Sequence, residues 1–165
     1  MPRDQDYATD LEPPSSTVSD DAARMALVDR ILAIAHLPAS AHVAVIGHRT
    51  LPYVLALMRK GCACVRSLRP DAPSPDCEPA GLAWIVDIAD EVELDEALRA
   101  ARGRAGKTGR VILEQAACCR GKGAAAIRDR ALAAGLDVVS FDHVARRVVL
   151  AATPRMAPPR LEMVS

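Results

Sequence analysis

The feature that most constrains the fold is an apolar run that ends in a glycine and is followed by a helical segment and a second apolar run. Residues 42–47 read His-Val-Ala-Val-Ile-Gly, and residues 62–68 read Cys-Ala-Cys-Val-Arg-Ser-Leu. Between them, Pro52 opens a helical segment, 53–60, that Gly61 closes. A strand, a helix and a strand within roughly thirty residues form a right-handed crossover. The two strands are therefore expected to pair in parallel.

The rest of the chain continues this alternation of apolar runs and helical stripes. We expect an opening helix with Ser19 as its N-cap, where Asp20 and Asp21 suit the helix dipole. Gly103 and Gly135 are expected to end two later helices. Only five residues join the last two strands, and so short a link permits a hairpin but no crossover. The later elements are predicted as strand, helix, strand, helix, strand and strand at residues 82–88, 91–102, 110–114, 124–134, 137–141 and 147–152.

These elements predict an α/β fold class, namely a three-layer Rossmann-like domain with a mostly parallel sheet and a C-terminal antiparallel hairpin. The loop at residues 69–80 contains four prolines and leaves no room for a further helix and strand, so one strand-helix unit is shortened or missing. We expect residues 1–18 to form a disordered, acidic and proline-rich tail, residues 19–154 to form the α/β domain, and residues 155–165 to form a flexible C-terminal tail.

Composition and charge argue against several classes of function. The 21 Lys and Arg residues balance the 21 Asp and Glu residues, so no global charge attracts nucleic acid or a membrane. One Trp, one Phe and two Tyr are too few for a platform on which single-stranded nucleic acid stacks. The Lys and Arg residues of segment 99–130 are divided between the two ends of the predicted strands, which disfavours nucleic-acid binding. Those at the amino ends, joined by Arg59 and Lys60, suit an acidic protein partner.

The five cysteines lie largely in apolar runs, and their odd number indicates reduced thiols and a cytoplasmic protein. The N-terminal segment lacks the apolar core of a signal peptide, and no apolar stretch is long enough to span a bilayer. Cys62 and Cys64 alternate to one face of a predicted strand and do not form a metal-binding knuckle. We therefore expect small buried thiols and no metal.

The order of the elements resembles the class I S-adenosylmethionine-dependent methyltransferases, whose parallel sheet ends in an antiparallel last strand. The resemblance runs from about residue 19 to residue 154. It is carried by the first strand with its loop (AHVAVIGHRTLPYVLALMRKG), the second strand (CACVRSLRPD), the fourth (GLAWIVDIAD), the fifth (GRVILEQ) and the terminal pair (GLDVVSFDHVARRVVLAATP). It implies a methyltransferase-like protein with S-adenosylmethionine as its cofactor.

The resemblance also implies which residues bind the cofactor. Members of the family carry a GxGxG loop after the first strand, and this chain has Gly47 followed by His48 and Arg49, a degenerate form of that loop. Asp71 matches the acid that holds the ribose hydroxyls. Asp87 lies where fourth-strand residues face the cofactor and the substrate. The acid within the first strand and the third strand with its helix are missing from this chain.

The rule for open parallel sheets points to the same region, because ligands bind at the carboxyl ends of the strands where the strand order reverses. A helix N-terminus beside a glycine and an arginine suits an anion or a nucleotide-like small molecule. The residues that this rule brings to one rim are Gly47, His48, Arg49, Asp71, Asp87, Asp90 and Glu114. Of these, His48 has a side chain suited to general-base catalysis.

Three functions fit these patterns. The first is an S-adenosylmethionine-binding protein, active or relict. The second is a non-catalytic binding or regulatory module that keeps the scaffold without the cofactor, which the bulky loop residues and the missing unit favour. The third is an NADP-type domain in which Arg69 reads a 2′-phosphate, and the absence of a G-x-G-x-x-G motif and the terminal hairpin disfavour it.

Overall fold

The computed structural model describes residues 17–72, 78–114 and 124–152. The elements, in chain order, are α1 (Thr17–Ile34), β1 (His42–Ile46), α2 (Leu51–Arg59), β2 (Cys64–Leu68), β3 (Leu82–Ile85), α3 (Glu91–Ala105), β4 (Arg110–Glu114), α4 (Ala124–Ala133), β5 (Leu136–Asp142) and β6 (Arg147–Ala152). No helix in these three stretches is long and apolar enough to cross a membrane. The predicted C-terminal tail and most of the predicted N-terminal tail lie outside the described residues.

The sheet has the order β2-β1-β3-β4-β6-β5. β1 pairs in parallel with β2 and β3, and β3 pairs in parallel with β4. β6 is antiparallel to both of its neighbours, because the short link after β5 returns the chain directly alongside it. The predicted α/β class, with a mostly parallel sheet and a C-terminal antiparallel hairpin, is confirmed.

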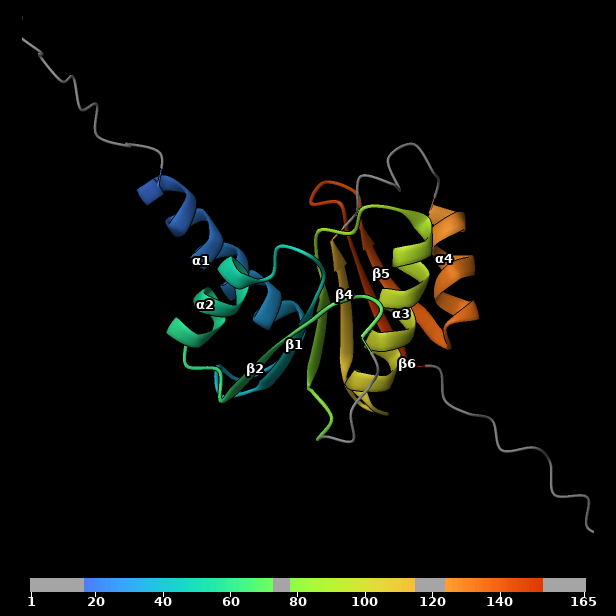
Figure 1. Ribbon diagram of the computed structural model, residues 1–165, viewed down its shortest axis with the longest axis horizontal. Coiled ribbons are helices and arrows are strands. Elements are labelled where there is room, and N and C mark those ends of the chain that lie inside the picture. The colour runs from blue at the N-terminus through green and yellow to red at the C-terminus, as the bar shows by residue number, and fades with distance from the viewer. Residues whose placement is uncertain (1–16, 73–77, 115–123, 153–165) are drawn as a thin grey trace, which may run out of the picture.

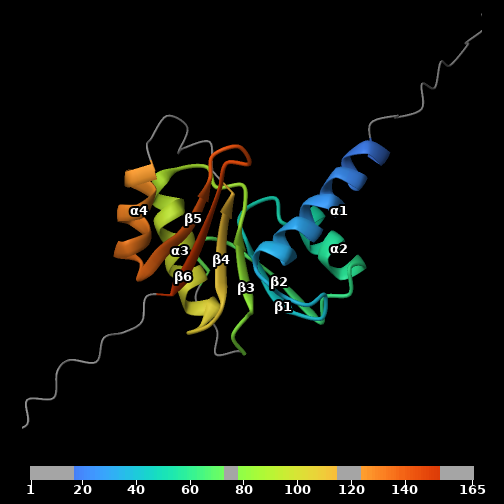
Figure 2. The ribbon, with the colours of Figure 1, turned by 180° about the vertical axis from the view of Figure 1, so that it is seen from behind.

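Helices cover the two faces of the sheet in pairs (Figures 1 and 2). In Figure 1, α1 and α2 lie to the left of the sheet and α3 and α4 lie to its right, and in Figure 2 the two sides are exchanged. Along α3, Ala97, Ala101 and Ala105 face the strands, and their small side chains let this helix lie close to the sheet. Trp84 is fully buried on the opposite face, under α1 and α2. A core of small aliphatic residues therefore needs few aromatic rings.

Four predicted boundaries are wrong. Ser19 was expected to cap the first helix after a disordered tail of residues 1–18, but α1 begins at Thr17 and Ser19 lies within its first turn. Gly103 was expected to end a helix, but α3 continues to Ala105 and ends at Gly106, whose φ of 61° is one that a glycine adopts readily. The strand expected at 82–88 stops at Ile85, since the chain turns at Asp87. The strand expected from Cys62 begins at Cys64, and Cys62 lies in the preceding turn with its thiol buried. At the two strands, tertiary context overrides the local apolar runs, and the helix boundaries differ from the predicted ones by two or three residues.

Candidate functional site

The strand order reverses between β1 and β3, so the carboxyl ends of these strands are where the fold offers a ligand crevice. Gly47 follows β1 with a φ of 151°, and a Cβ built there would lie 1.8 Å from the carbonyl oxygen of Val86. The Gly47 N–H donates to the carbonyl of Leu68 at 3.0 Å, and the Val86 N–H donates to the carbonyl of Ile46 at 2.9 Å. Backbone therefore closes the floor of the crevice, and only glycine fits at position 47.

His48 extends from the loop after β1 to the first turn of α3. Its Nε2 lies 2.6 Å from Oε1 of Glu93, and Oε2 of Glu93 accepts the backbone N–H of Ala89 at 2.9 Å. Asp90 caps the helix by accepting the Glu93 N–H at 2.9 Å. The Ala89 N–H, and then the hydrogen bond from His48, hold the pKa of Glu93 below its usual value. His48 thus joins the first loop to the cap of α3.

Arg49 and Asp87 make a second link across the same crevice. The Arg49 backbone N–H donates to Oδ2 of Asp87 at 3.2 Å, and the Arg49 guanidinium Nε lies 3.8 Å from that oxygen. Asp87 has a φ of 50°, a left-handed conformation that aspartate tolerates better than most residues. This turn directs its carboxylate back toward the loop after β1. The predicted site residues Gly47, His48, Arg49 and Asp87 therefore lie together.

Asp71, which the sequence also placed on this rim, follows the end of β2 by three residues. It lines a cavity of about 290 Å³ with neighbouring loop residues and the middle of α3, together Pro70, Asp71, Ala72, Glu96, Arg99 and Ala100. The two regions are adjacent along α3, because Glu96 of the cavity follows Glu93 by three residues and so lies one helical turn away. The predicted residues thus occupy two neighbouring stretches of one surface.

A polar cluster that sequence reasoning largely missed lies on the α1–α2 side of the rim. Oε1 of Glu114 accepts hydrogen bonds from Nε1 of Trp84 at 3.3 Å and from Nε of Arg147 at 2.7 Å. The Tyr53 ring meets the Trp84 ring edge-on, with centroids 5.0 Å apart. Burial, followed by the nearby Glu114 carboxylate, raises the pKa of Tyr53. Glu114 was expected at the rim, but only the β4–β6 register brings Arg147 opposite it.

Arg147 is the most deeply buried charge of this cluster. Its side chain is 5% exposed, and its Nη1 has no hydrogen-bond partner among the described residues. Burying a cation requires a partner, and Glu114 neutralises it at one nitrogen only. The cluster therefore depends on both members of the pair. The described residues hold no group of three His, Cys, Asp or Glu side chains that could bind a metal ion.

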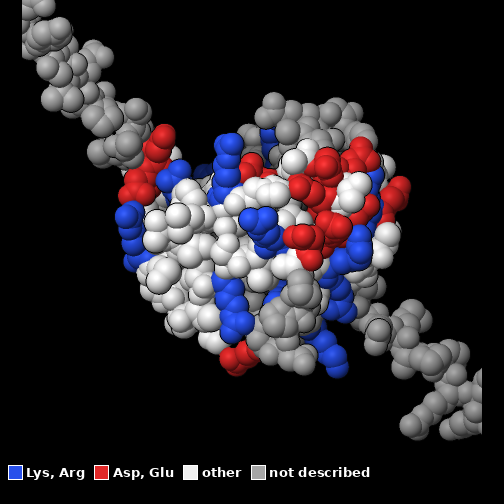
Figure 3. Space-filling view, viewed as in Figure 1, with Lys and Arg blue, Asp and Glu red and all other residues white. Residues whose placement is uncertain are grey.

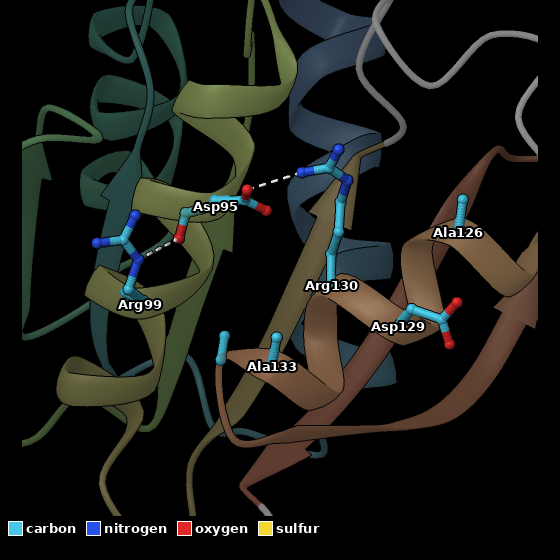
Figure 4. A pocket seen from close by; sticks show the side chains of 7 residues that line it. Asp95, Arg99, Ala126, Asp129, Arg130 and Ala133 are labelled. Atoms are coloured by element: carbon cyan, nitrogen blue, oxygen red, sulfur yellow. Dashed lines mark hydrogen bonds and ion pairs between the residues drawn. The ribbon is translucent and has the colours of Figure 1, made fainter.

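A further cavity lies between α3 and α4, away from the crevice. Its volume is about 500 Å³, and Figure 4 shows Arg130 extending from α4 toward Asp95 of α3, at 2.7 Å. Arg130 also pairs with Glu91, and Arg99 donates to the backbone carbonyl of Asp95 at 3.1 Å. The two Arg130 ion pairs connect the two helices, whereas the Arg99 contact lies within α3. We assign the groove to helix packing, since it contains none of the residues predicted for the site.

The basic residues expected near the amino ends of the strands are largely engaged within the molecule. Arg59 and Lys60 at the end of α2 pair with Asp21 and Asp29 of α1, at 2.6 and 2.7 Å. Arg104 in α3 is buried. The expectation of an acidic protein partner there stays a prediction.

Comparison with known proteins identifies the fold. No protein-family model matches the chain, and no curated protein matches it by sequence. Among solved structures, a TehB-like SAM-dependent methyltransferase from Corynebacterium glutamicum has 13% identity and a TM-score of 0.52, with 82% of this chain and 95% of that chain covered. The CcbJ methyltransferase from Streptomyces caelestis has 13% identity and a TM-score of 0.54, over 81% and 92% of the two chains.

A third match is an O-methyltransferase from neocarzinostatin biosynthesis, solved in complex with S-adenosylmethionine. It has 16% identity and a TM-score of 0.54, and covers 82% of this chain and 57% of that one. At these identities the likeness concerns the fold. The strand order with its reversed sixth strand agrees with it. The chain therefore has the fold of the class I S-adenosylmethionine-dependent methyltransferases.

Proposed function

We propose that this protein binds a nucleotide-like ligand of the S-adenosylmethionine type along the side of the rim that α3 lines. The observation that carries the proposal is the cavity of about 290 Å³ beside Asp71, in a fold whose solved relatives include a complex with S-adenosylmethionine. Pockets for small ligands usually measure about 300–1,000 Å³. The cavity thus suits the nucleoside part of the ligand, and the remainder would extend along the rim.

The polar groups suit the two ends of such a ligand. In the cavity, the carboxylates of Asp71 and Glu96 are acceptors for the two hydroxyls of a ribose. At the rim, Arg49 and the N-terminus of α2 offer positive charge to a carboxylate. Glu93 lies between these regions, one turn from Glu96. Methyl transfer requires mainly proximity and alignment, so the absence of an acid–base motif does not argue against it.

A second candidate function is that of a non-catalytic binding or regulatory module that keeps the scaffold without the cofactor. It is favoured by the contacts that close the crevice between β1 and β3. The backbone at Gly47 touches Val86, and the His48–Glu93 and Arg49–Asp87 contacts bridge the loops above it. A cofactor lying directly across these strand ends would have to displace both bridges.

Isothermal titration calorimetry with adenosine, S-adenosylmethionine and S-adenosylhomocysteine tests the proposal. We expect saturable heat for the adenosine-containing ligands, and its loss in Asp71→Asn, because the amide is a weaker acceptor for ribose hydroxyls. Asp129→Asn is the matched control, since Asp129 is an exposed acid on α4 outside the Asp71 cavity. If none of the three ligands binds at millimolar concentration, the proposal fails and the second candidate remains. Equal binding by the two variants would refute the role of Asp71.

A further inference from the structure

The outer side of α2 carries an apolar stripe that no described element covers. Leu51, Leu55 and Met58 recur at i, i+4 and i+7, which places them on one face of the helix. They are 65%, 45% and 59% exposed, whereas Ala56 and Leu57 on the opposite side are buried. Figure 3 shows the corresponding surface as a broad uncharged area between basic side chains. We call these three residues the α2 ridge.

Exposed arginines stand at both ends of the ridge. Arg49 lies two residues before Leu51, the first residue of α2, and Arg59 is the last residue of the helix. Each is paired with one carboxylate, Asp87 at 3.8 Å and Asp21 at 2.6 Å, in exposed contacts of the kind that contribute little stability. An apolar strip between positive charges suits a segment that combines apolar and acidic side chains.

The segment that precedes α1 has this composition. Residues 1–16 contain four acids and one arginine, together with Tyr7 and Leu11 at helical spacing; the acids are Asp4, Asp6, Asp10 and Glu12. Segments with many acids and few apolar residues can order on a complementary surface. Its charge and its apolar residues therefore match the α2 ridge and its flanking arginines.

The chain connectivity brings this segment to the ridge. α1 begins at Thr17, and Asp21, about one turn later, contacts Arg59 at the C-terminal end of the ridge. The ridge spans eight residues of helix, from Leu51 to Met58, or about 10 Å. Leu11 lies six residues before Thr17 and so reaches up to ~20 Å from it. Tethering at this short distance gives a high effective concentration, so a weak contact is sufficient for occupancy.

We propose that residues 1–16 dock on the α2 ridge. Tyr7 and Leu11 cover the apolar side chains, and the acids lie toward Arg49 and Arg59. The docked segment removes the exposed apolar stripe from water. It also brings negative charge to Arg49, at the edge of the candidate ligand site.

Methyl NMR of the full chain labelled at methionine tests this proposal. A soluble paramagnetic probe broadens methyl signals in proportion to their exposure, and Met58 reports directly on the ridge. We expect the Met58 methyl to be protected in the full chain and broadened several-fold more after deletion of residues 1–16. Deletion of residues 155–165 is the matched control and should leave Met58 unchanged. Met25, a partly buried residue of α1 that packs against the core, serves as the internal reference.

Two further measurements separate the other occupants. A synthetic peptide of residues 1–16 should restore the protection of the Met58 methyl in the truncated chain, and this protection should be weaker at high salt. The peptide should not protect Met58 in a truncated chain that also carries Leu55→Asp. Equal broadening of Met58 in the full and truncated chains would overturn the proposal. Protection that persists after truncation and rises with protein concentration would also overturn it, because a second copy of the chain would then cover the ridge.

Discussion

Replacement of Gly47 by alanine tests the close approach of the two loops at the rim. The new Cβ would lie 1.8 Å from the Val86 carbonyl oxygen, and the backbone has a φ of 151° that alanine does not adopt without strain. Backbone strain costs about 1–3 kcal/mol, and forcing atoms into a packed site costs about as much again. We therefore expect Gly47→Ala to lower the free energy of unfolding by about 2–6 kcal/mol, a large share of a typical total of about 5–15 kcal/mol.

Gly61→Ala is the matched control. Gly61 also has a positive φ, 89°, but a Cβ there would have nothing within 4 Å, so only the backbone term applies. Urea unfolding of both variants should show the larger loss for Gly47→Ala, and each additional kcal/mol should lower the melting temperature by about 2–4 °C in a chain of this size. Equal losses in the two variants would show that the loop after β1 does not press on the Val86 backbone, and the closed crevice would have to be abandoned.

Three other predictions follow from the buried and ionisable groups. Glu114→Ala should destabilise the chain by about 3–5 kcal/mol in urea unfolding, because it leaves the buried Arg147 cation uncompensated. Replacing both Glu114 and Arg147 by apolar residues should cost much less. Equal losses of unfolding free energy in the single and double variants would contradict this prediction. Because the folded-state pKa of Glu93 is lowered, the contribution of this carboxylate to stability is complete above the usual glutamate pKa and is lost as pH falls through the lowered value. Glu93→Gln should therefore flatten the acid side of the curve of unfolding free energy against pH. An unchanged curve would refute this prediction. The pKa of Tyr53 is raised, so its phenolate absorbance should appear above pH 10.0, and stability should fall as pH rises above this value. Tyr53→Phe should remove both effects. A titration midpoint of 10.0 for Tyr53 in the folded chain would refute the argument that burial raises its pKa.

Local pattern determined most of the secondary structure. Apolar runs of strand length predicted β1 and β4, and helical spacing predicted α3 and α4, because hydrophobic periodicity is a property of neighbouring residues. The five-residue link predicted the hairpin of β5 and β6 by geometry alone. The same reasoning brought Gly47, His48, Arg49 and Asp87 to one rim, since the carboxyl ends of parallel strands lie at the same edge of a sheet.

Tertiary structure alone decided which side chains meet. His48 reaches Glu93 across 45 positions of sequence, and Arg147 opposes Glu114 only because β6 lies beside β4 in one register. Asp71 was expected on the same rim as Gly47, and only the tertiary structure shows that it lines a cavity with residues of α3. Periodicity reports which face of an element is apolar, whereas the distance between remote side chains depends on strand order and helix placement. These follow from packing of the whole chain and have no local signal.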